Sequence, residues 1–328
     1  MMAGITPGSL YGGSRIRRQN LELDSAGGMH LALVVLLGTA VTGGNAFHTG
    51  GSLAQHATGL QRASRLAHTT CGRADVRMQA ASKGKLLVLG GTGFVGSTVT
   101  KLAISRGYDV VSMSRRGTPP ADSPLASEAR ITWKQGDATK AEDVQRVAAE
   151  GGFTGVVHAI GMLFEGELNK FASGSGSIPS EGVTYDDITR RTAFNAMDAA
   201  VANGIDKFGF VSAAEARWDF DDKFVGSPVE WLHRYLVAKR SVEARLDSLS
   251  PGLRSVIVRP SLIWTWEKPG ALLPVAAFTA GNALGIPFVD KPVSVDLLAR
   301  AMLNGMESES ESGIFDYTGM ERLADMRR

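Results

Sequence analysis

The chain has almost no cysteine and no large excess of charge of either sign. Its 328 residues include a single cysteine, Cys71, which excludes an internal disulfide framework. The 35 Lys and Arg residues nearly balance the 33 Asp and Glu residues, and 44% of all residues are hydrophobic. This composition excludes a disordered or collagen-like chain and is typical of a globular protein.

The basic charge is concentrated at the N-terminal end. Residues 1–83 hold eight Lys and Arg residues against three acids, whereas residues 84–328 hold 27 basic and 30 acidic residues. The body of the chain therefore lacks the basic stripe that binds nucleic acid, and no nucleic-acid partner is expected. No metal site is predicted either.

Residues 1–46 have the pattern of a secretory signal peptide. Arg15, Arg17 and Arg18 precede an apolar run at 31–41, and small residues suit a signal-peptidase cut after Ala46. The 11 residues of this run are too few to span a bilayer, because a helix needs about 20. A buried core helix is the alternative, although glycines flank the run on both sides.

Residues 47–83 are similar to a transit peptide, because they are rich in Arg and Ser and contain one acid, Asp75. A signal peptide followed by Phe47 and a transit-like stretch resembles the two-part leaders of algae whose plastids are wrapped in extra membranes. We therefore expect a plastid location, with the mitochondrion as the alternative. The mature chain is expected to begin near Gln79 and to lack Cys71.

Strand-like and helix-like segments alternate along residues 84–328, a length that suits one domain. Strands are expected at 85–90, 108–114, 131–136, 155–159, 207–212 and 254–259. Helices are expected at 94–105, 141–150, 185–203 and 235–249. This alternation predicts an α/β fold, a doubly wound and mostly parallel sheet, with a small C-terminal α/β substrate-binding region at 261–328.

A glycine-rich turn joins the first expected strand to the first expected helix. Its glycines permit a tight turn and let backbone amides approach a pyrophosphate, while the helix N-terminus carries partial positive charge. The position directly after an apolar strand favours a dinucleotide site over a purely structural turn. The predicted cofactor contacts are Gly90, Gly91, Thr92, Gly93, Phe94, Val95 and Gly96.

The end of the second expected strand indicates which dinucleotide is preferred. An NAD site would place an acid there, on the ribose 2′-hydroxyl, but this sequence has Ser114, Arg115 and Arg116. Two guanidinium groups suit a 2′-phosphate, which they hold by charge-assisted hydrogen bonds. We therefore expect NADP(H) to be preferred over NAD(H); the alternative is a pair of solvated loop arginines.

Two further strand ends contribute to the predicted site. Asp137 is expected either to accept a hydrogen bond from the adenine amino group or to cap the next helix. Ala159 and Gly161 are small residues that let a cofactor lie close to the fourth strand. His158 lies in an apolar run, so packing in the core is favoured over catalysis.

A candidate catalytic pair lies on the helix expected at 235–249. Tyr235 and Lys239 are four residues apart and share one helix face. An ammonium group beside a phenol favours the phenolate and lowers the phenol pKa, so Tyr235 is expected to donate and accept protons. Ser212, at the end of the fifth strand, is expected to hold a substrate carbonyl or, alternatively, to satisfy local backbone.

Together these motifs resemble the short-chain dehydrogenase/reductase superfamily. GGTGFVG, Ser212, the Tyr235 and Lys239 pair, Arg259-Pro260 and the segment at 292–296 are most similar to its atypical, extended-type branch, which has an NAD(P)-binding Rossmann domain. YLVAKRSVEARL followed by VIVRPSLIW is similar to one group within that branch. This group contains a yeast mitochondrial coenzyme Q biosynthesis protein, its plastid relatives and, more distantly, the NADPH-binding accessory subunit of complex I.

The resemblance implies a Rossmann fold over residues 84–320 and catalytic roles for Ser212, Tyr235 and Lys239. Lys239 would also contact the nicotinamide ribose. Thr189 stands near where many extended members carry a helix asparagine. Because some members hold NADPH without catalysis, a non-catalytic assembly or stabilising subunit is the second expectation. An NAD-dependent epimerase or dehydratase of nucleotide sugars is the third.

Residues 269–289 form a stretch of 21 residues without charge. Pro274, Gly281, Asn282, Gly285 and Pro287 argue against a continuous transmembrane helix, so an apolar lid or a surface resting on a membrane is expected. The leading function is therefore an NADP(H)-dependent oxidoreductase of a small apolar carbonyl or hydroxyl compound, in quinone or isoprenoid metabolism. The aromatic segment at 218–231 is expected to wall the substrate pocket or to pack its own loop, and the Gly/Ser-rich segment at 171–182 is expected to be mobile.

Overall fold

The computed structural model describes residues 82–121, 123–163, 180–267, 272–286 and 289–326. The expected signal peptide at 1–46, nearly all of the transit-like segment at 47–83 and most of the segment at 171–182 lie outside the described residues. The structure therefore does not test those expectations.

Seven parallel strands form one sheet in the order β3-β2-β1-β4-β5-β6-β9. They are β1 (Lys85–Leu89), β2 (Asp109–Ser114), β3 (Ile131–Gln135), β4 (Phe153–His158), β5 (Lys207–Val211), β6 (Arg254–Val258) and β9 (Gly313–Phe315). Residues 86–89 of β1, an interior strand of the sheet, are all buried, because helices cover both faces of a parallel sheet. The strand order reverses between β1 and β4, and the carboxyl ends of such strands are where open α/β sheets bind ligands.

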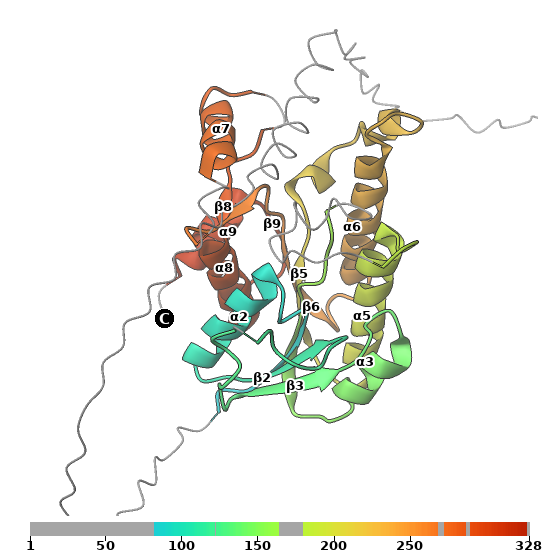
Figure 1. The fold of residues 1–328 in the computed structure, drawn as a ribbon, viewed down its shortest axis with the longest axis vertical. Coiled ribbons are helices and arrows are strands. Elements are labelled where there is room, and N and C mark those ends of the chain that lie inside the picture. Colours follow the sequence, from blue (N-terminus) through green and yellow to red (C-terminus); the bar gives the residue numbers. More distant parts are fainter. Residues whose placement is uncertain (1–81, 122, 164–179, 268–271, 287–288, 327–328) are drawn as a thin grey trace, which may run out of the picture.

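Helices cover the two faces of the sheet, and each face has its own apolar core (Figure 1). One face carries α3 (Ala141–Ala148), α5 (Thr192–Ala202) and α6 (Glu230–Ser248). The other carries α2 (Phe94–Ser105), α8 (Val295–Glu307) and α9 (Tyr317–Ala324). Apolar residues recur at helical spacing on the inner faces of these helices, as Leu298 and Met302 do on α8. With helices on both faces of a parallel sheet, the predicted doubly wound α/β fold is confirmed.

Three of the four expected helices have different bounds, and the one expected at 141–150 ends at Ala148. The helix expected at 185–203 is interrupted, because residues 186–191 form a π-helix, η2 (Asp186–Arg191), before α5 begins. The hydroxyl of Thr192 donates to the carbonyl oxygen of Ile188 at 2.5 Å within this turn. The helix expected at 235–249 begins earlier, at Glu230, so Tyr235 lies in its second turn rather than at its start.

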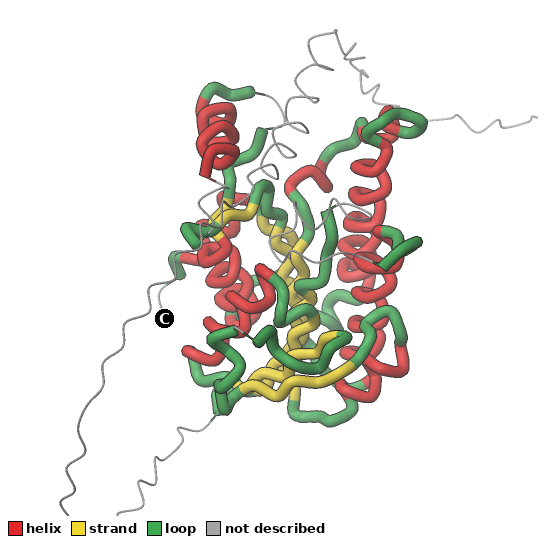
Figure 2. Tube along the Cα trace, in the orientation of Figure 1, coloured by secondary structure: helices red, strands yellow, loops and turns green. Residues whose placement is uncertain are grey.

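The C-terminal region is divided between the main body and a small outlying part. Strand β9 pairs with β6, and α8 and α9 pack on the main sheet, so they complete the main body of the fold. Strands β7 (Ile263–Trp264) and β8 (Val293–Ser294) form a separate two-stranded sheet, and α7 (Leu272–Ala283) stands apart from the main helix layers (Figure 2). Residues 261–328 are thus divided between the main body and this smaller part, and the substrate-binding role expected for them stays a prediction. Within the described ranges no helix has both the length and the apolar character to cross a membrane.

Candidate functional site

The residues predicted to hold a cofactor gather along one edge of the sheet. The glycine turn connects β1 to α2. Arg115 and Arg116 follow the carboxyl end of β2, Asp137 follows that of β3, and Ala159 and Gly161 follow that of β4. Ser212 follows β5, and Tyr235 and Lys239 lie on α6. Because all these strands are parallel, their carboxyl ends share one edge, and the sequence motifs are brought together there.

The turn after β1 contains positions where no side chain fits. A Cβ atom at position 96 would lie 2.1 Å from the carbonyl oxygen of Gly90, and Gly90 itself has a φ of +86°. Gly93 precedes α2 without a side chain that could cap it, and the first turn of α2 contains no acid. Uncapped amides at a helix N-terminus bind anions, so this turn suits a pyrophosphate.

A cavity of about 410 Å³ lies beside the carboxyl ends of β2 and β3. Arg115, Lys140 and Arg146 contribute cationic side chains to its lining, and Arg116 is not part of the lining. The remaining lining residues are Gln135, Gly136, Asp137 and Asp143. The sequence did not single out Lys140 and Arg146, although both follow β3 closely, where a ligand at the carboxyl edge would meet them.

Asp137 forms a local turn before α3. Its Oδ1 accepts hydrogen bonds from the amide and the hydroxyl of Thr139 at 3.0 and 2.8 Å, and its own amide donates to Oδ2 of Asp143 at 2.9 Å. The Asp137 side chain does not cap α3, because the N-cap residue is Lys140 and it has no side-chain cap bond. The role as an adenine acceptor stays a prediction. Its position in the cavity lining nevertheless keeps Asp137 beside the predicted adenosine end of the site.

His158 is fully buried at the end of β4, as the packing interpretation predicts. Its Nε2 lies 2.8 Å from the hydroxyl oxygen of Thr192, whose hydrogen goes to Ile188. Thr192 must therefore accept from Nε2–H, which leaves Nδ1 without a proton. Burial, together with the charge of Lys239, lowers the pKa of His158 to about 3. A neutral ring of this kind does not carry protons near neutral pH.

Lys239 and Tyr235 lie side by side on α6. The ammonium group of Lys239 donates to the carbonyl oxygen of Val211 at 2.7 Å and lies 5.5 Å from the centre of the Tyr235 ring. Burial lowers the pKa of Lys239 to about 8, and the carboxylate of Glu243 opposes this change. The small Gly161 is near enough that a Cβ there would lie 3.9 Å from the Lys239 nitrogen.

The expectation that Lys239 lowers the pKa of Tyr235 is wrong for this structure. Burial raises the pKa of the Tyr235 phenol, and the negative charge of Glu215 and the phenol of Tyr185 act in the same direction. Desolvation of the phenolate is the largest of these influences on the pKa of Tyr235. A phenol that remains protonated is suited to donating a proton to a developing alkoxide.

Ser212 is bonded to a buried ion pair that the sequence did not single out. Its hydroxyl donates to Oε1 of Glu243 at 2.5 Å. Glu243 also accepts from Nε of Arg259 at 2.9 Å and from Nη2 at 2.5 Å. A hydroxyl has one hydrogen, so Ser212 cannot donate to a substrate carbonyl while it is bonded to Glu243. The available sequence signal was the four-residue spacing of Glu243 from Lys239.

Glu215 is a second charged residue that sequence reasoning missed. It lies on the short helix η3 (Ala214–Arg217), directly after β5. Burial raises the pKa of Glu215 to about 7, Asp290 adds to this change, and Arg217 opposes it. A carboxyl group with a pKa of about 7 therefore lies near Tyr235 at the carboxyl edge of the sheet.

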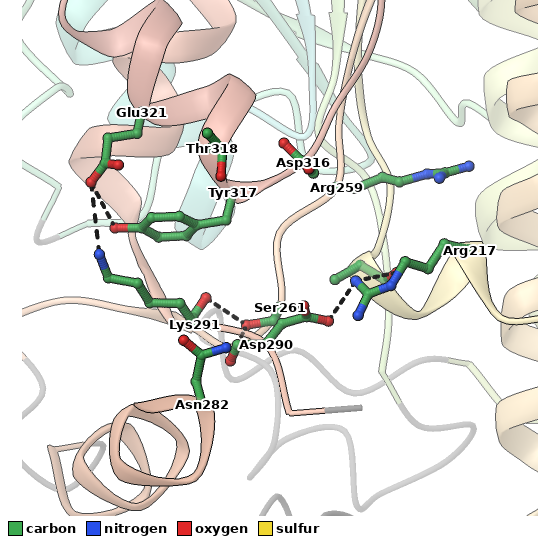
Figure 3. A pocket seen from close by; sticks show the side chains of 11 residues that line it. Arg217, Arg259, Ser261, Asn282, Asp290, Lys291, Asp316, Tyr317, Thr318 and Glu321 are labelled. Atoms are coloured by element: carbon green, nitrogen blue, oxygen red, sulfur yellow. Dashed lines mark hydrogen bonds and ion pairs between the residues drawn. The ribbon is translucent and has the colours of Figure 1, made fainter. Parts of the chain in front are cut away.

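A larger cavity of about 460 Å³ lies beyond the carboxyl ends of β5, β6 and β9 (Figure 3). Inside it Nη1 of Arg217 lies 2.7 Å from Asp290, and the Lys291 nitrogen lies 3.7 Å from Glu321. The full lining is Ala214, Arg217, Arg259, Ser261, Asn282, Asp290, Lys291, Asp316, Tyr317, Thr318 and Glu321. Among the described residues, the uncharged segment at 269–289 contributes only Asn282 to this lining, most of which is polar or charged. The role of the segment as a lid or as a membrane surface stays a prediction.

The aromatic segment before α6 packs on itself. Trp218 and Phe224 are buried with Leu232 and Leu236, and the rings of Trp218 and Phe220 stack 5.2 Å apart. None of these aromatic side chains lines either of the two cavities, which favours the packing alternative.

A second buried ion pair holds the same loop to α6. The carboxylate of Asp221, in η4 (Asp221–Phe224), accepts two hydrogen bonds from Arg240 at 3.0 and 2.7 Å. Asp221 also lies 2.9 Å from Nδ1 of His233. These contacts fix the loop against α6, the helix that carries Tyr235 and Lys239.

Known proteins share this sequence pattern and architecture. A family model described as NAD(P)H-binding matches residues 90–307. An uncharacterised chloroplastic protein of Arabidopsis thaliana is 26% identical over 277 residues, which cover 78% of this chain and 80% of that protein. MIOREX complex component 2 of Saccharomyces cerevisiae is 33% identical over 115 residues, which cover 34% of this chain and 39% of that protein. The X-ray structure of Pal from Bacillus thuringiensis is similar in fold, with a TM-score of 0.51 at 18% identity over 73% of this chain and 81% of that one.

Proposed function

The chain belongs to the NAD(P)H-binding family, as a Rossmann-fold protein of the short-chain dehydrogenase/reductase and epimerase type, and we propose that it is an NADP(H)-dependent oxidoreductase. One observation carries the proposal: a single sheet edge bears an uncapped glycine turn, a cavity with three cations, and the half-buried Tyr235 beside the buried Lys239. A bound dinucleotide is long enough to need all three features side by side along the sheet edge, for its pyrophosphate, its adenosine end and its nicotinamide end.

The residues present fit NADP(H). The glycine turn suits the pyrophosphate, because a side chain at position 96 would collide with the turn itself. Arg115, Lys140 and Arg146 would surround the adenosine end, where a 2′-phosphate distinguishes NADP from NAD. Ala159, Gly161 and Lys239 would border the nicotinamide end. The bound nicotinamide supplies or removes a hydride at the substrate carbon.

Tyr235 is the proton donor in this proposal. In the reducing direction its hydroxyl hydrogen moves to the substrate oxygen, and in the oxidising direction the phenolate oxygen takes that hydrogen back. The raised pKa of Tyr235 supports the reducing direction, because the phenol is protonated at neutral pH. Lys239 orients the ribose and stabilises negative charge on the tyrosine oxygen. The hydroxyl of Ser212 has lone pairs to offer to a ligand but no free hydrogen.

The substrate proposed is a carbonyl or hydroxyl compound with an apolar body and a polar reacting end. The uncharged segment at 269–289 supports the apolar part. The polar lining of the 460 Å³ cavity supports a reacting end that carries hydrogen-bonding oxygens, as a quinone ring does. Quinone or isoprenoid metabolism is the corresponding setting.

A plastid location is part of the proposal. The composition of residues 1–83 supports it, and so does the similarity to a chloroplastic protein of Arabidopsis thaliana. A fluorescent reporter fused to residues 1–83 should accumulate in plastids. A reporter that stays in the cytosol or is secreted would contradict this part, and mitochondrial accumulation would favour the alternative.

Calorimetric titration with NADPH and with NADH tests the cofactor assignment. Replacing Arg115 by Ala should weaken NADPH binding by about 10-fold or more, because a charge-assisted hydrogen bond contributes about 1.5–3 kcal/mol. NADH binding should not change. Arg130→Ala is the control, since Arg130 lies away from the cavity and bonds to Asp109 at 3.1 Å. Equal losses for both nucleotides, or no binding of either, would refute the assignment.

Replacing Tyr235 by Phe separates catalysis from mere binding. The variant should bind NADPH as the native chain does and should lose turnover, because Phe cannot donate the proton. A variant that sustains the biological role in cells would instead support a non-catalytic assembly or stabilising subunit.

A further inference from the structure

Three elements of the fold meet at one buried carboxylate beneath the candidate site. Glu243 lies on α6, four residues after Lys239, so Tyr235, Lys239 and Glu243 occupy one helix face at regular intervals. Its carboxylate accepts hydrogen bonds from Ser212, which follows β5, and from Arg259, which follows β6. Glu243 is 6% exposed, and Ser212 and Lys239 are 3% and 4% exposed.

The direction of the Arg259 side chain connects this carboxylate to the larger cavity. Arg259 belongs to the cavity lining, but Figure 3 shows its guanidinium extending away from the other lining side chains. The guanidinium instead makes a two-pronged pair with Glu243. The ends of β5 and β6 are thereby tied to the helix that carries Tyr235 and Lys239.

Stability alone does not account for such a pair. Removing two charges from water costs nearly as much as their attraction returns, and apolar residues of similar volume often serve as well. The pair acts instead on its neighbour, because the negative charge of Glu243 supports the charged form of the buried Lys239. This support opposes desolvation, which is the largest influence on that amine.

We propose that Ser212, Glu243 and Arg259 form a positioning network that holds Lys239 in place and in its charged form for dinucleotide binding. The network gives Ser212 a structural partner within the protein in place of contact with the substrate carbonyl. The role of Lys239 in dinucleotide binding rests on the proposed oxidoreductase function. The effect of the network on the charge of Lys239 does not depend on that function. Ser212 and Arg259 hold the Glu243 carboxylate in one buried position, on the helix face that also carries Lys239.

Other charged and titratable groups around Lys239 act differently. His158 on β4 is neutral, and the ring of Phe210 on β5 lies 5.0 Å from the Lys239 nitrogen. Tyr235 keeps its proton, and Glu215 on η3 acts on Tyr235. Glu243 is thus the anion that supports Lys239 among the described residues.

The test measures the pKa of Lys239 in the purified chain without nucleotide. Protein with ¹³C-labelled lysine reports this pKa through the Cε resonance of Lys239, which a Lys239→Met variant identifies. In Glu243→Gln the side chain keeps its shape and the negative charge disappears. We expect the pKa of Lys239 to fall by about one unit or more, as the loss of a charge within one helical turn requires.

Asp221→Asn is the matched control. It breaks the similar ion pair with Arg240 on the same helix, so it carries a similar structural cost, and it should leave the pKa of Lys239 unchanged. Glu243→Asp is the second variant; it keeps the charge and should move that pKa by no more than a few tenths of a unit. Equal shifts in Glu243→Gln and Asp221→Asn, or no shift in Glu243→Gln, would overturn the proposal. If Glu243→Gln does not fold, a fall of a full unit in Glu243→Asp would overturn it.

NADPH titration of the same variants separates this proposal from the proposed function. Glu243→Gln should bind NADPH about 5-fold more weakly at pH 8, because a fall of one unit from about 8 lowers the charged fraction of Lys239 from about one half to about one tenth. Asp221→Asn should bind NADPH normally. If no variant and not even the native chain binds NADPH, the proposed function fails. The shift of the lysine pKa would still establish the network.

Discussion

Replacing Gly96 by Ala should damage the nucleotide site more than it damages the fold. A Cβ atom at this position would lie 2.1 Å from the carbonyl oxygen of Gly90 and 2.7 Å from its carbon, both of which are backbone atoms. Real Cβ contacts stay beyond 3.0 Å, so the turn and the start of α2 must move apart by about 0.9 Å. Overpacking of this size costs about 1–3 kcal/mol of folding stability.

The same displacement moves the amides at the start of α2 away from the pyrophosphate. Losing one or two charge-assisted hydrogen bonds of about 1.5–3 kcal/mol each corresponds to a loss of about 10-fold to more than 1,000-fold in NADPH affinity. Calorimetry measures the affinity, and urea unfolding followed by circular dichroism measures the stability.

Replacing two other glycines by Ala should affect NADPH binding less than Gly96→Ala does. At Gly93 the added Cβ would lie 3.2 Å from the Gly90 oxygen, so Gly93→Ala needs a shift of only a few tenths of an ångström and should weaken NADPH binding less. At Gly204 there is free space around a φ of +67°, so Gly204→Ala should cost about 1 kcal/mol in stability and nothing in binding. Native NADPH affinity in a folded Gly96→Ala variant would refute the assignment of this turn to the pyrophosphate.

Three other outcomes are expected. Because the pKa of His158 is lowered to about 3 in the fold, the unfolded chain binds the extra proton below its ordinary value of 6.5. The contribution of this residue to the free energy of unfolding should therefore fall by about 1.4 kcal/mol per pH unit as the pH falls from 6.5 towards 3. Urea unfolding should show that the native chain is about 2 kcal/mol less stable at pH 5 than at pH 7 because of His158, and that His158→Asn lacks this loss. In Gly209→Ala the new Cβ would lie 2.5 Å from the sulfur of Met302. Thermal unfolding should therefore show a loss of about 1–3 kcal/mol in folding stability. An unchanged melting temperature would mean that the methionine side chain moves aside freely. If the segment at 269–289 rests on a membrane, Leu284→Asp should reduce co-sedimentation with lipid vesicles, since Leu284 is 79% exposed; equal co-sedimentation of variant and native chain would argue against that surface.

Much of the fold was predictable because it depends on local patterns. The apolar strand at 85–89 and the glycine turn after it are adjacent in the sequence, and their strand-turn-helix form needs no distant partner. The alternation of strands and helices then requires a parallel sheet, and a parallel sheet aligns the strand ends that carry Arg115, Asp137 and Gly161.

The parts that could not be predicted depend on long-range contacts. Ser212 and Glu243 are 31 residues apart, and their hydrogen bond exists only because α6 packs against the end of β5. The direction of the Tyr235 pKa depends on how much protein surrounds the phenol, which a Tyr-xxx-Lys spacing does not indicate. The large cavity takes most of its polar lining from η3, the residues before β8 and α9, which are far apart in the sequence and meet only in the fold.

The sequence by itself determined the α/β architecture, the dinucleotide turn and the residues at each strand end, because backbone periodicity and glycine geometry are properties of short segments. The tertiary structure alone decided which of those residues touch, which are desolvated and which are already bonded to a partner. Lys239 shows the difference: its spacing from Tyr235 is visible in the sequence, but its charge depends on burial and on Glu243. Burial and the approach of distant charges set the electrostatics of a site, and both arise only when the chain is packed.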